Sequence, residues 1–397
     1  MPLLTLHSWA GGNLAAEFQY ALFNPVMLAL YAVLPAFDDQ AAAAAFLSIA
    51  LSGVLTAGGL ALGRALGLPV GLAHVAATAI GGNAFLHFWF AVSWFPGFAA
   101  TAYLVWAMAF VAIAHRGRGT FLGCVAATFL TTTAGWPQAV VALGAFTFVW
   151  LVALQRCQGW RPALDAGSAA LLGVLTGAVG IGPLVGVAEV ARRSTEIGNA
   201  GLLVANLRDV LSLSSPLHFA VLPFFDHATL LQAPVFMAAW FVLPLAALID
   251  WPRVSWKEPE VATLVGFAGL MVLATQGPSQ LLWMRYPIKF LPYVQIGAVL
   301  LVLVPRGAAA RCCARTAPAG GGHLPAIRRA ARDRWGGIAG HGAAGLRTHY
   351  RGAGLLGQAY GQNAGTALRP DRVAAGTGHG ERILPNWSSR LVAAVLL

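Results

Sequence analysis

The stretch AAAAAFLSIALSGVLTAGGLAL, residues 41–62, decides the fold class of this chain. It contains no charged residue and is followed by Gly63 and Arg64. A helix that crosses the hydrocarbon core of a bilayer needs about 20 mostly apolar residues. The stretch therefore predicts a transmembrane helix that stops at Arg64.

The composition of the whole chain favours the same fold class. Of its 397 residues, 58% are hydrophobic and only 10% are charged, and the mean hydropathy is +0.70. About a quarter of the residues in a soluble globular domain are charged. This composition excludes a soluble enzyme, a disordered protein and a coiled coil.

Other apolar segments extend the prediction to an all-α, polytopic transmembrane bundle of about nine or ten spans. One further segment, residues 23–37, is ambiguous because it has no clear orientation. The predicted spans are residues 41–62, 66–80, 97–114, 120–133, 138–154, 166–188, 233–249, 261–275 and 291–304.

The arginines and lysines orient this bundle, because these residues stay in the short cytoplasmic loops. With Arg64 inside, alternating spans place ten basic residues of the turns up to Arg315 on the cytoplasmic side. The outer loops then hold only five, which are Arg192, Arg193, Arg208, Arg285 and Lys289. We therefore expect a multi-pass protein of the cell membrane, with its longer polar loops on the outer face.

Residues 306–397 differ in composition from the transmembrane domain, residues 1–305. The net charge is +11, and the 13 arginines and three acids after residue 305 account for +10 of it. Gly/Ala/Arg-rich sequence without periodicity predicts a disordered basic tail attracted to anionic lipid. The abrupt onset favours a second interpretation, out-of-frame translation of a GC-rich gene. In neither case does the charge indicate a nucleic-acid partner.

Motifs of soluble catalysis are absent from the sequence. It has no P-loop, no His-Glu-x-x-His and no Gly-x-Ser-x-Gly, and nothing in it requires a metal or a cofactor. His74, inside a predicted span, is expected to bond to a neighbouring helix. The aromatic residues 85–90 are expected to form an interfacial belt. Gly173 and Gly177 have the spacing of close helix packing.

Cations on the outer face are the strongest candidates for a binding site. Arg192 and Arg193 follow a predicted span, and Arg285 and Lys289 are four residues apart before the last one. Arginine binds phosphate with two parallel hydrogen bonds, and a lipid-linked phosphate would arrive at this depth. The alternatives are a salt bridge of Arg192 and Arg193 with Glu189 and simple interfacial anchoring of Arg285 and Lys289.

Outer-face acids are the candidates for a general base. Glu17, Asp38 and Asp39 are the first candidates among them, although the adjacent Asp38 and Asp39 also suit a plain solvated loop. The other acids on this face are Glu196, Asp209 and Asp226.

The run GGNLAAEFQYALFNP, residues 11–25, resembles the first outer loop of the YfhO-like bacterial membrane proteins, relatives of the GT-C glycosyltransferases. The Gly135-Trp136-Pro137 turn, residues 189–195 and residues 285–292 are also similar. The resemblance covers about residues 9–305. It implies a polyprenyl-phosphate sugar donor, and an outer-loop acid such as Glu17, Asp38 or Asp39 that deprotonates the acceptor. Arg192, Arg193, Arg285 and Lys289 would bind the donor phosphate.

This sequence departs from the family pattern at both ends. The family has a span and an acidic residue before the Gly-Gly-Asn run. One interpretation of the resemblance is therefore an N-terminally truncated fragment that lacks the usual base and is inactive. The final helices are replaced by the basic tail.

Two other classes of protein remain open, a transporter or flippase for a lipid-linked substrate and a structural membrane subunit. A transporter is expected to carry ionisable groups at mid-membrane depth. Apart from His74, the predicted spans are almost free of them.

Overall fold

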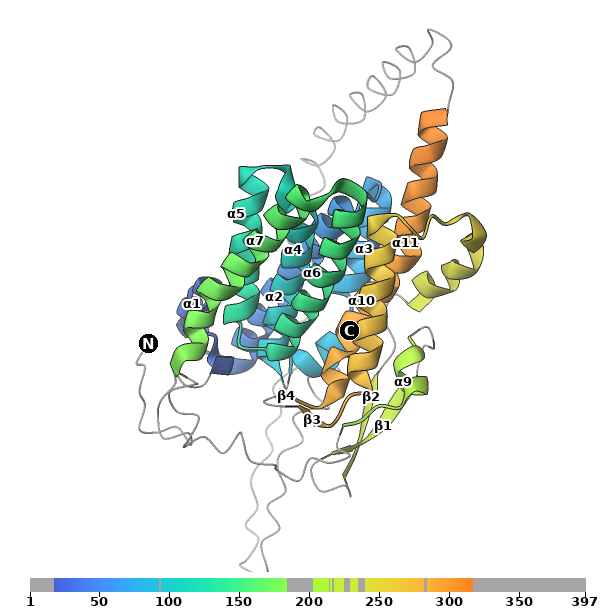
Figure 1. Ribbon diagram of the computed structural model, residues 1–397. Helices are drawn as coiled ribbons and strands as arrows, with labels where there is room; N and C mark the ends of the chain where they lie inside the picture. The colour runs from blue at the N-terminus through green and yellow to red at the C-terminus, as the bar shows by residue number, and fades with distance from the viewer. Residues whose placement is uncertain are drawn as a thin grey trace, which may run out of the picture. The chain divides into compact units, whose positions relative to one another are not determined.

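The computed structural model shows an all-α, polytopic membrane protein (Figure 1). It describes residues 18–92, 94–183, 203–213, 215, 218–224, 229–234, 240–281 and 284–316. The chain divides into two compact units, Met1–Ala317 and Pro318–Leu397. The second unit, and with it most of the expected tail, lies outside the described residues. Helix α11 runs through residue 306, where the tail was expected to begin.

Helices form most of the described chain. The α-helices are α1 (Pro25–Val33), α2 (Gln40–Ala65), α3 (Val70–Gly81), α4 (Phe95–Ile113), α5 (Arg118–Thr133), α6 (Pro137–Gln158), α7 (Trp160–Gly177), α9 (Leu207–Leu211), α10 (Pro259–Thr275) and α11 (Leu291–Thr316). Short 3-10 or π turns are η1 (Phe18–Tyr20), η2 (Leu34–Ala36), η3 (Leu86–Phe90), η4 (Ala114–Arg116), η5 (Ala178–Ile181), η7 (Trp240–Leu248), η8 (Trp251–Arg253) and η9 (Pro287–Phe290).

Two antiparallel hairpins complete the described elements. Strand β1 (Phe219–Phe224) pairs with β2 (Thr229–Pro234), with Phe219 opposite Pro234. Strand β3 (Gln280–Leu281) pairs with β4 (Met284–Arg285), with Gln280 opposite Arg285.

Five helical segments among the described residues are long and apolar enough to cross a membrane. They are Gln40–Ala65, Phe95–Arg116, Pro137–Gln158, Trp160–Ile181 and Pro287–Pro305. The shorter helices α3, α5 and α10 coincide with three further predicted spans. The sequence prediction therefore locates most of the bundle correctly.

The predicted helix over residues 233–249 is wrong in its described part. Ala233 and Pro234 belong to strand β2, and Trp240–Leu248 forms a 3-10 helix that contains Pro244. Proline lacks the N–H of an α-helical hydrogen bond, and its ring clashes with the carbonyl one turn earlier. Hydropathy alone cannot detect this interruption.

Proline and glycine set the ends of the helices. A proline occupies one of the first two positions of α1, α4, α6 and α10, where its missing N–H costs nothing. Gly135 (φ 78°) connects α5 to α6 and Gly159 (φ 91°) connects α6 to α7, both in the left-handed region that suits glycine. The predicted turn at Gly135-Trp136-Pro137 is confirmed.

Because successive helices run in opposite directions, the bundle has two ends that carry different connecting segments. At the turn end, η4 joins α4 to α5 and Gly159 joins α6 to α7. At the hairpin end, α3 and α10 finish and α4, α6 and α11 begin. The hairpins β1–β2 and β3–β4 and helix α9 lie at this second end (Figure 1). The hairpin end corresponds to the expected outer face.

Candidate functional site

An aromatic cluster fills the hairpin end of the bundle. Trp89 stacks on Trp94 with 4.6 Å between ring centroids, and Phe90 packs edge-on against both Trp94 and Trp136. Phe85, Trp89 and Phe90 are buried, and Phe88 is exposed. The interfacial belt expected over residues 85–90 is therefore wrong for most of its members. The π turn η3 folds them back onto the start of α4, which a hydropathy pattern does not reveal.

Lys289 lies inside this cluster. Its Nζ is 4.2 Å from the Trp94 ring centroid, 4.4 Å from that of Trp136 and 5.1 Å from that of Tyr286, and the residue is only 8% exposed. Aromatic faces attract a cation most strongly where water is excluded. The expectation of an interfacial anchor does not fit this position, since an anchor keeps its charged group in water.

A backbone bond closes the β3–β4 hairpin, and a side chain of α6 attaches it to the bundle. The Tyr286 N–H donates to the Ser279 carbonyl at 2.8 Å, and the Gln138 side chain donates to the Arg285 carbonyl at 3.4 Å. Nearby, the buried Asn83 amide donates to Gln295 of α11. The first two bonds fix the hairpin that carries Arg285, and the third joins the residues before η3 to α11.

Replacing Lys289 by alanine is expected to lower the free energy of unfolding by about 2–4 kcal/mol. The change removes a desolvated cation–π interaction and leaves a cavity where the side-chain stem packed. Exposed Lys257 provides the matched control, and its alanine variant should behave like the parent protein. Unfolding in mixed micelles measures both, and equal stability of the two variants would contradict the role of Lys289.

Arg285 is the more accessible cation of this segment. It sits on β4 with its side chain partly buried. Among the described residues, no hydrogen bond or ion pair to its guanidinium is found. Arg285 can therefore offer two parallel N–H donors to an anion at the rim of the hairpin end.

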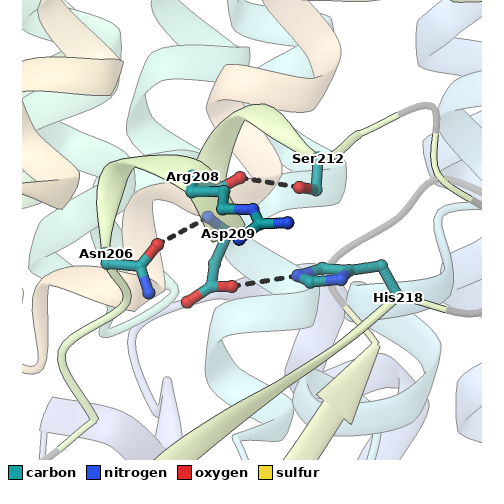
Figure 2. A network of polar contacts seen from close by, with 5 residues as sticks. All are labelled: Asn206, Arg208, Asp209, Ser212 and His218. Atoms are coloured by element: carbon teal, nitrogen blue, oxygen red, sulfur yellow. Dashed lines mark hydrogen bonds and ion pairs between the residues drawn. The ribbon is translucent and has the colours of Figure 1, made fainter.

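A histidine–aspartate pair lies on the segment before β1. His218 Nε2 is 2.9 Å from Asp209 Oδ1, and their side chains are 30% and 13% exposed. Figure 2 shows the ring and the carboxylate turned toward one another. The Asn206 side chain accepts from the Asp209 N–H, and Ser212 Oγ donates to the Arg208 carbonyl, so the α9 turn is closed at both ends.

This pair has the geometry of a general base with its orienting group. A carboxylate bonded to one ring nitrogen fixes the imidazole tautomer and stabilises the charge that the ring gains with a proton. The other nitrogen is then the one that accepts the proton. Exposed Arg208 is the residue next to Asp209, so a cation accompanies the base.

The pair and the Arg285 hairpin belong to the same end of the bundle. Gln276, which follows α10, donates through its side chain to the Ala205 carbonyl at 3.4 Å. Strand β2 also packs near η3 of the aromatic cluster. The elements that carry the two polar groups, α9 and the β3–β4 hairpin, thus lie at one end of the bundle (Figure 1).

None of the other predicted site residues that the structure describes has a place in this site. Asp38 is exposed, and the Asp39 carboxylate accepts from the Ala41 N–H at 3.0 Å as the N-cap of α2. Glu17, Arg192 and Arg193 lie outside the described residues. His74 bonds to the Val70 carbonyl of its own helix at 2.8 Å, so the expected bond to a neighbouring helix is wrong.

Sequence reasoning missed His218, because no local motif links it to Asp209. The only signal was the recurrence of two titratable residues, nine positions apart, around a serine-rich turn. In the part of the chain that the structure describes, no group of three His, Cys, Asp or Glu side chains is arranged to hold a metal ion.

No family model matches the chain, and no curated protein and no solved structure matches it either.

Proposed function

We propose that this membrane protein is a glycosyltransferase-like enzyme that uses a polyprenyl-phosphate sugar at the hairpin end of its bundle. The observation that carries the proposal is the Asp209–His218 pair beside Arg208, tied through Gln276 to the segment that bears Arg285. A base and two cations at one end of an apolar bundle suit a substrate that combines a hydroxyl acceptor with a lipid-anchored phosphate.

Each of these side chains has one role in the proposed reaction. His218 takes the proton of the acceptor hydroxyl as its oxygen forms the bond to the anomeric carbon of the sugar. The bond from that carbon to the phosphate oxygen breaks, and polyprenyl phosphate leaves with the electron pair. Arg208 and Arg285 neutralise the negative charge that develops on the leaving group. Lys289 supports the Arg285 segment from within the aromatic cluster.

Replacing Arg285 by glutamine is expected to weaken binding of polyprenyl phosphate about 10-fold or more, because a charge-assisted pair to the phosphate is lost. Binding to the full-length chain in nanodiscs of neutral lipid measures the effect. Arg156→Gln removes the same charge from the turn end and serves as the control. An equal loss in both variants, or no loss in Arg285→Gln, would contradict a phosphate site at the hairpin end.

The transporter and the structural subunit are distinguished by the products. A transporter would move the lipid-linked sugar between leaflets without releasing free polyprenyl phosphate, and a structural subunit would do neither. Release of polyprenyl phosphate that depends on an acceptor is the result expected of the transferase.

A further inference from the structure

A second charged site lies at the turn end of the bundle, remote in sequence from the groups of the proposed transferase. An open pocket of about 310 Å³ lies between the α4–α5 turn and the first half of α7. Ala114, Phe121 and Leu122 supply apolar surface, and His115, Arg118 and Asp165 supply the polar groups. A mostly apolar pocket of this volume with few polar groups is typical of a small-ligand site.

The charge around the pocket favours an anion. Arg116, Arg118 and Arg161 are all exposed, and Asp165 is the acid of the pocket wall. No ion pair joins these three guanidiniums to any acid within the described ranges. Their N–H groups are therefore available to the oxygens of a phosphate, which arginine binds in bidentate fashion.

His115 also lines the pocket. Its Nδ1 is buried, and no hydrogen-bond partner is found for it among the described residues.

Exposed apolar side chains place the pocket at a membrane boundary. Leu122 in the pocket wall is 64% exposed, and Leu164, next to Asp165, is 63% exposed. Trp160 at the start of α7 is 68% exposed, a position that tryptophan favours at the headgroup level. A ligand at this site thus meets an apolar surface on its membrane side and arginines on its water side.

We propose that this pocket binds one anionic glycerophospholipid of the leaflet at the turn end. Its phosphate lies between Arg118 and Arg116, and an acyl chain follows Leu122. Positive residues predict that the turn end faces the cytoplasm, where anionic lipids give the membrane surface a negative potential. The site would fix α5 and α7 to that leaflet. This proposal is independent of the transferase.

Native mass spectrometry of the full chain, released from detergent with phosphatidylglycerol or phosphatidylcholine, tests the site. Phosphatidylglycerol should bind to the parent protein more tightly than phosphatidylcholine. Arg118→Gln should weaken the binding of phosphatidylglycerol about 5-fold, and Arg116→Gln with Arg118→Gln about 25-fold, as expected for one surface charge each. Leu122→Asp should weaken it also, because it places a carboxylate against the acyl chain and the phosphate.

Arg156→Gln is the matched control, because Arg156 is exposed at the same end but belongs to the last turn of α6, outside the α4–α5 turn that forms the pocket. Its binding should stay within 2-fold of the parent. An equal loss in Arg156→Gln and Arg118→Gln would overturn the proposal in favour of general charge attraction. Equal affinity for both lipids in the parent protein would also overturn it. Binding of glycerophosphoglycerol, which lacks the acyl chains, as tightly as phosphatidylglycerol would overturn it as well.

Discussion

His218→Ala is expected to slow acceptor-dependent release of polyprenyl phosphate by about 10²–10⁴-fold. General base catalysis by a positioned side chain contributes this much, and the Asp209 carboxylate at 2.9 Å positions the imidazole. Asp209→Asn should cause a loss of similar size, because the amide can hold the imidazole in the wrong tautomer. The rate is measured with purified protein in liposomes that contain a polyprenyl-phosphate hexose.

His74→Ala is the control for this experiment. His74 is exposed on α3 and bonds only to the backbone of its own helix among the described residues, so its loss should leave the rate within 2-fold. Unchanged activity in His218→Ala together with inactive Arg285→Gln would show that the base lies elsewhere, for example at Glu17 or Asp38.

Gly173→Leu is expected to destabilise the bundle by about 3 kcal/mol or more. A Cβ at Gly173 would meet Thr128 Oγ1 and lie 2.5 Å from the Val125 carbonyl oxygen, so α5 and α7 must separate. Backbone atoms cannot move aside like a flexible side chain, and overpacking of this kind is costly. Thermal unfolding of the detergent-solubilised protein measures the loss.

Gly144 provides the matched control for helix packing. It is an exposed glycine of α6, and a Cβ built there meets nothing within 4 Å. Gly144→Leu should therefore keep the unfolding temperature of the parent protein. If Gly173→Leu proved equally stable, the contact between α5 and α7 would be looser than the structure indicates.

Most of the bundle could be predicted because the bilayer imposes simple rules on length and polarity. The residues 41–62 became α2, and Gly173 packs closely against α5 as its spacing predicted. Prediction failed where local geometry outweighs hydropathy. Pro244 interrupts the expected helix, and the π turn at residues 86–90 buries aromatic residues whose sequence pattern predicts an interfacial belt.

The site was less predictable, because it depends on contacts between distant segments. Lys289 meets Trp94 and Trp136 from two other turns, and no spacing rule in the sequence brings these residues together. Arg285 was identified from its charge on the outer face, which needs no tertiary information. The sequence offers the Asp39 carboxylate as a general base, but in the structure it caps α2, a role that N-cap propensity also predicts.

We propose that the hairpin end transfers a sugar from a lipid-linked phosphate. Glycolipid and wall-glycan analysis of a deletion strain, complemented with the parent gene or with Arg285→Ala, tests it most directly. We expect the deletion to remove a glycan, the parent gene to restore it, and Arg285→Ala to fail at equal protein levels in the membrane. Unchanged glycans in the deletion strain would contradict the transferase.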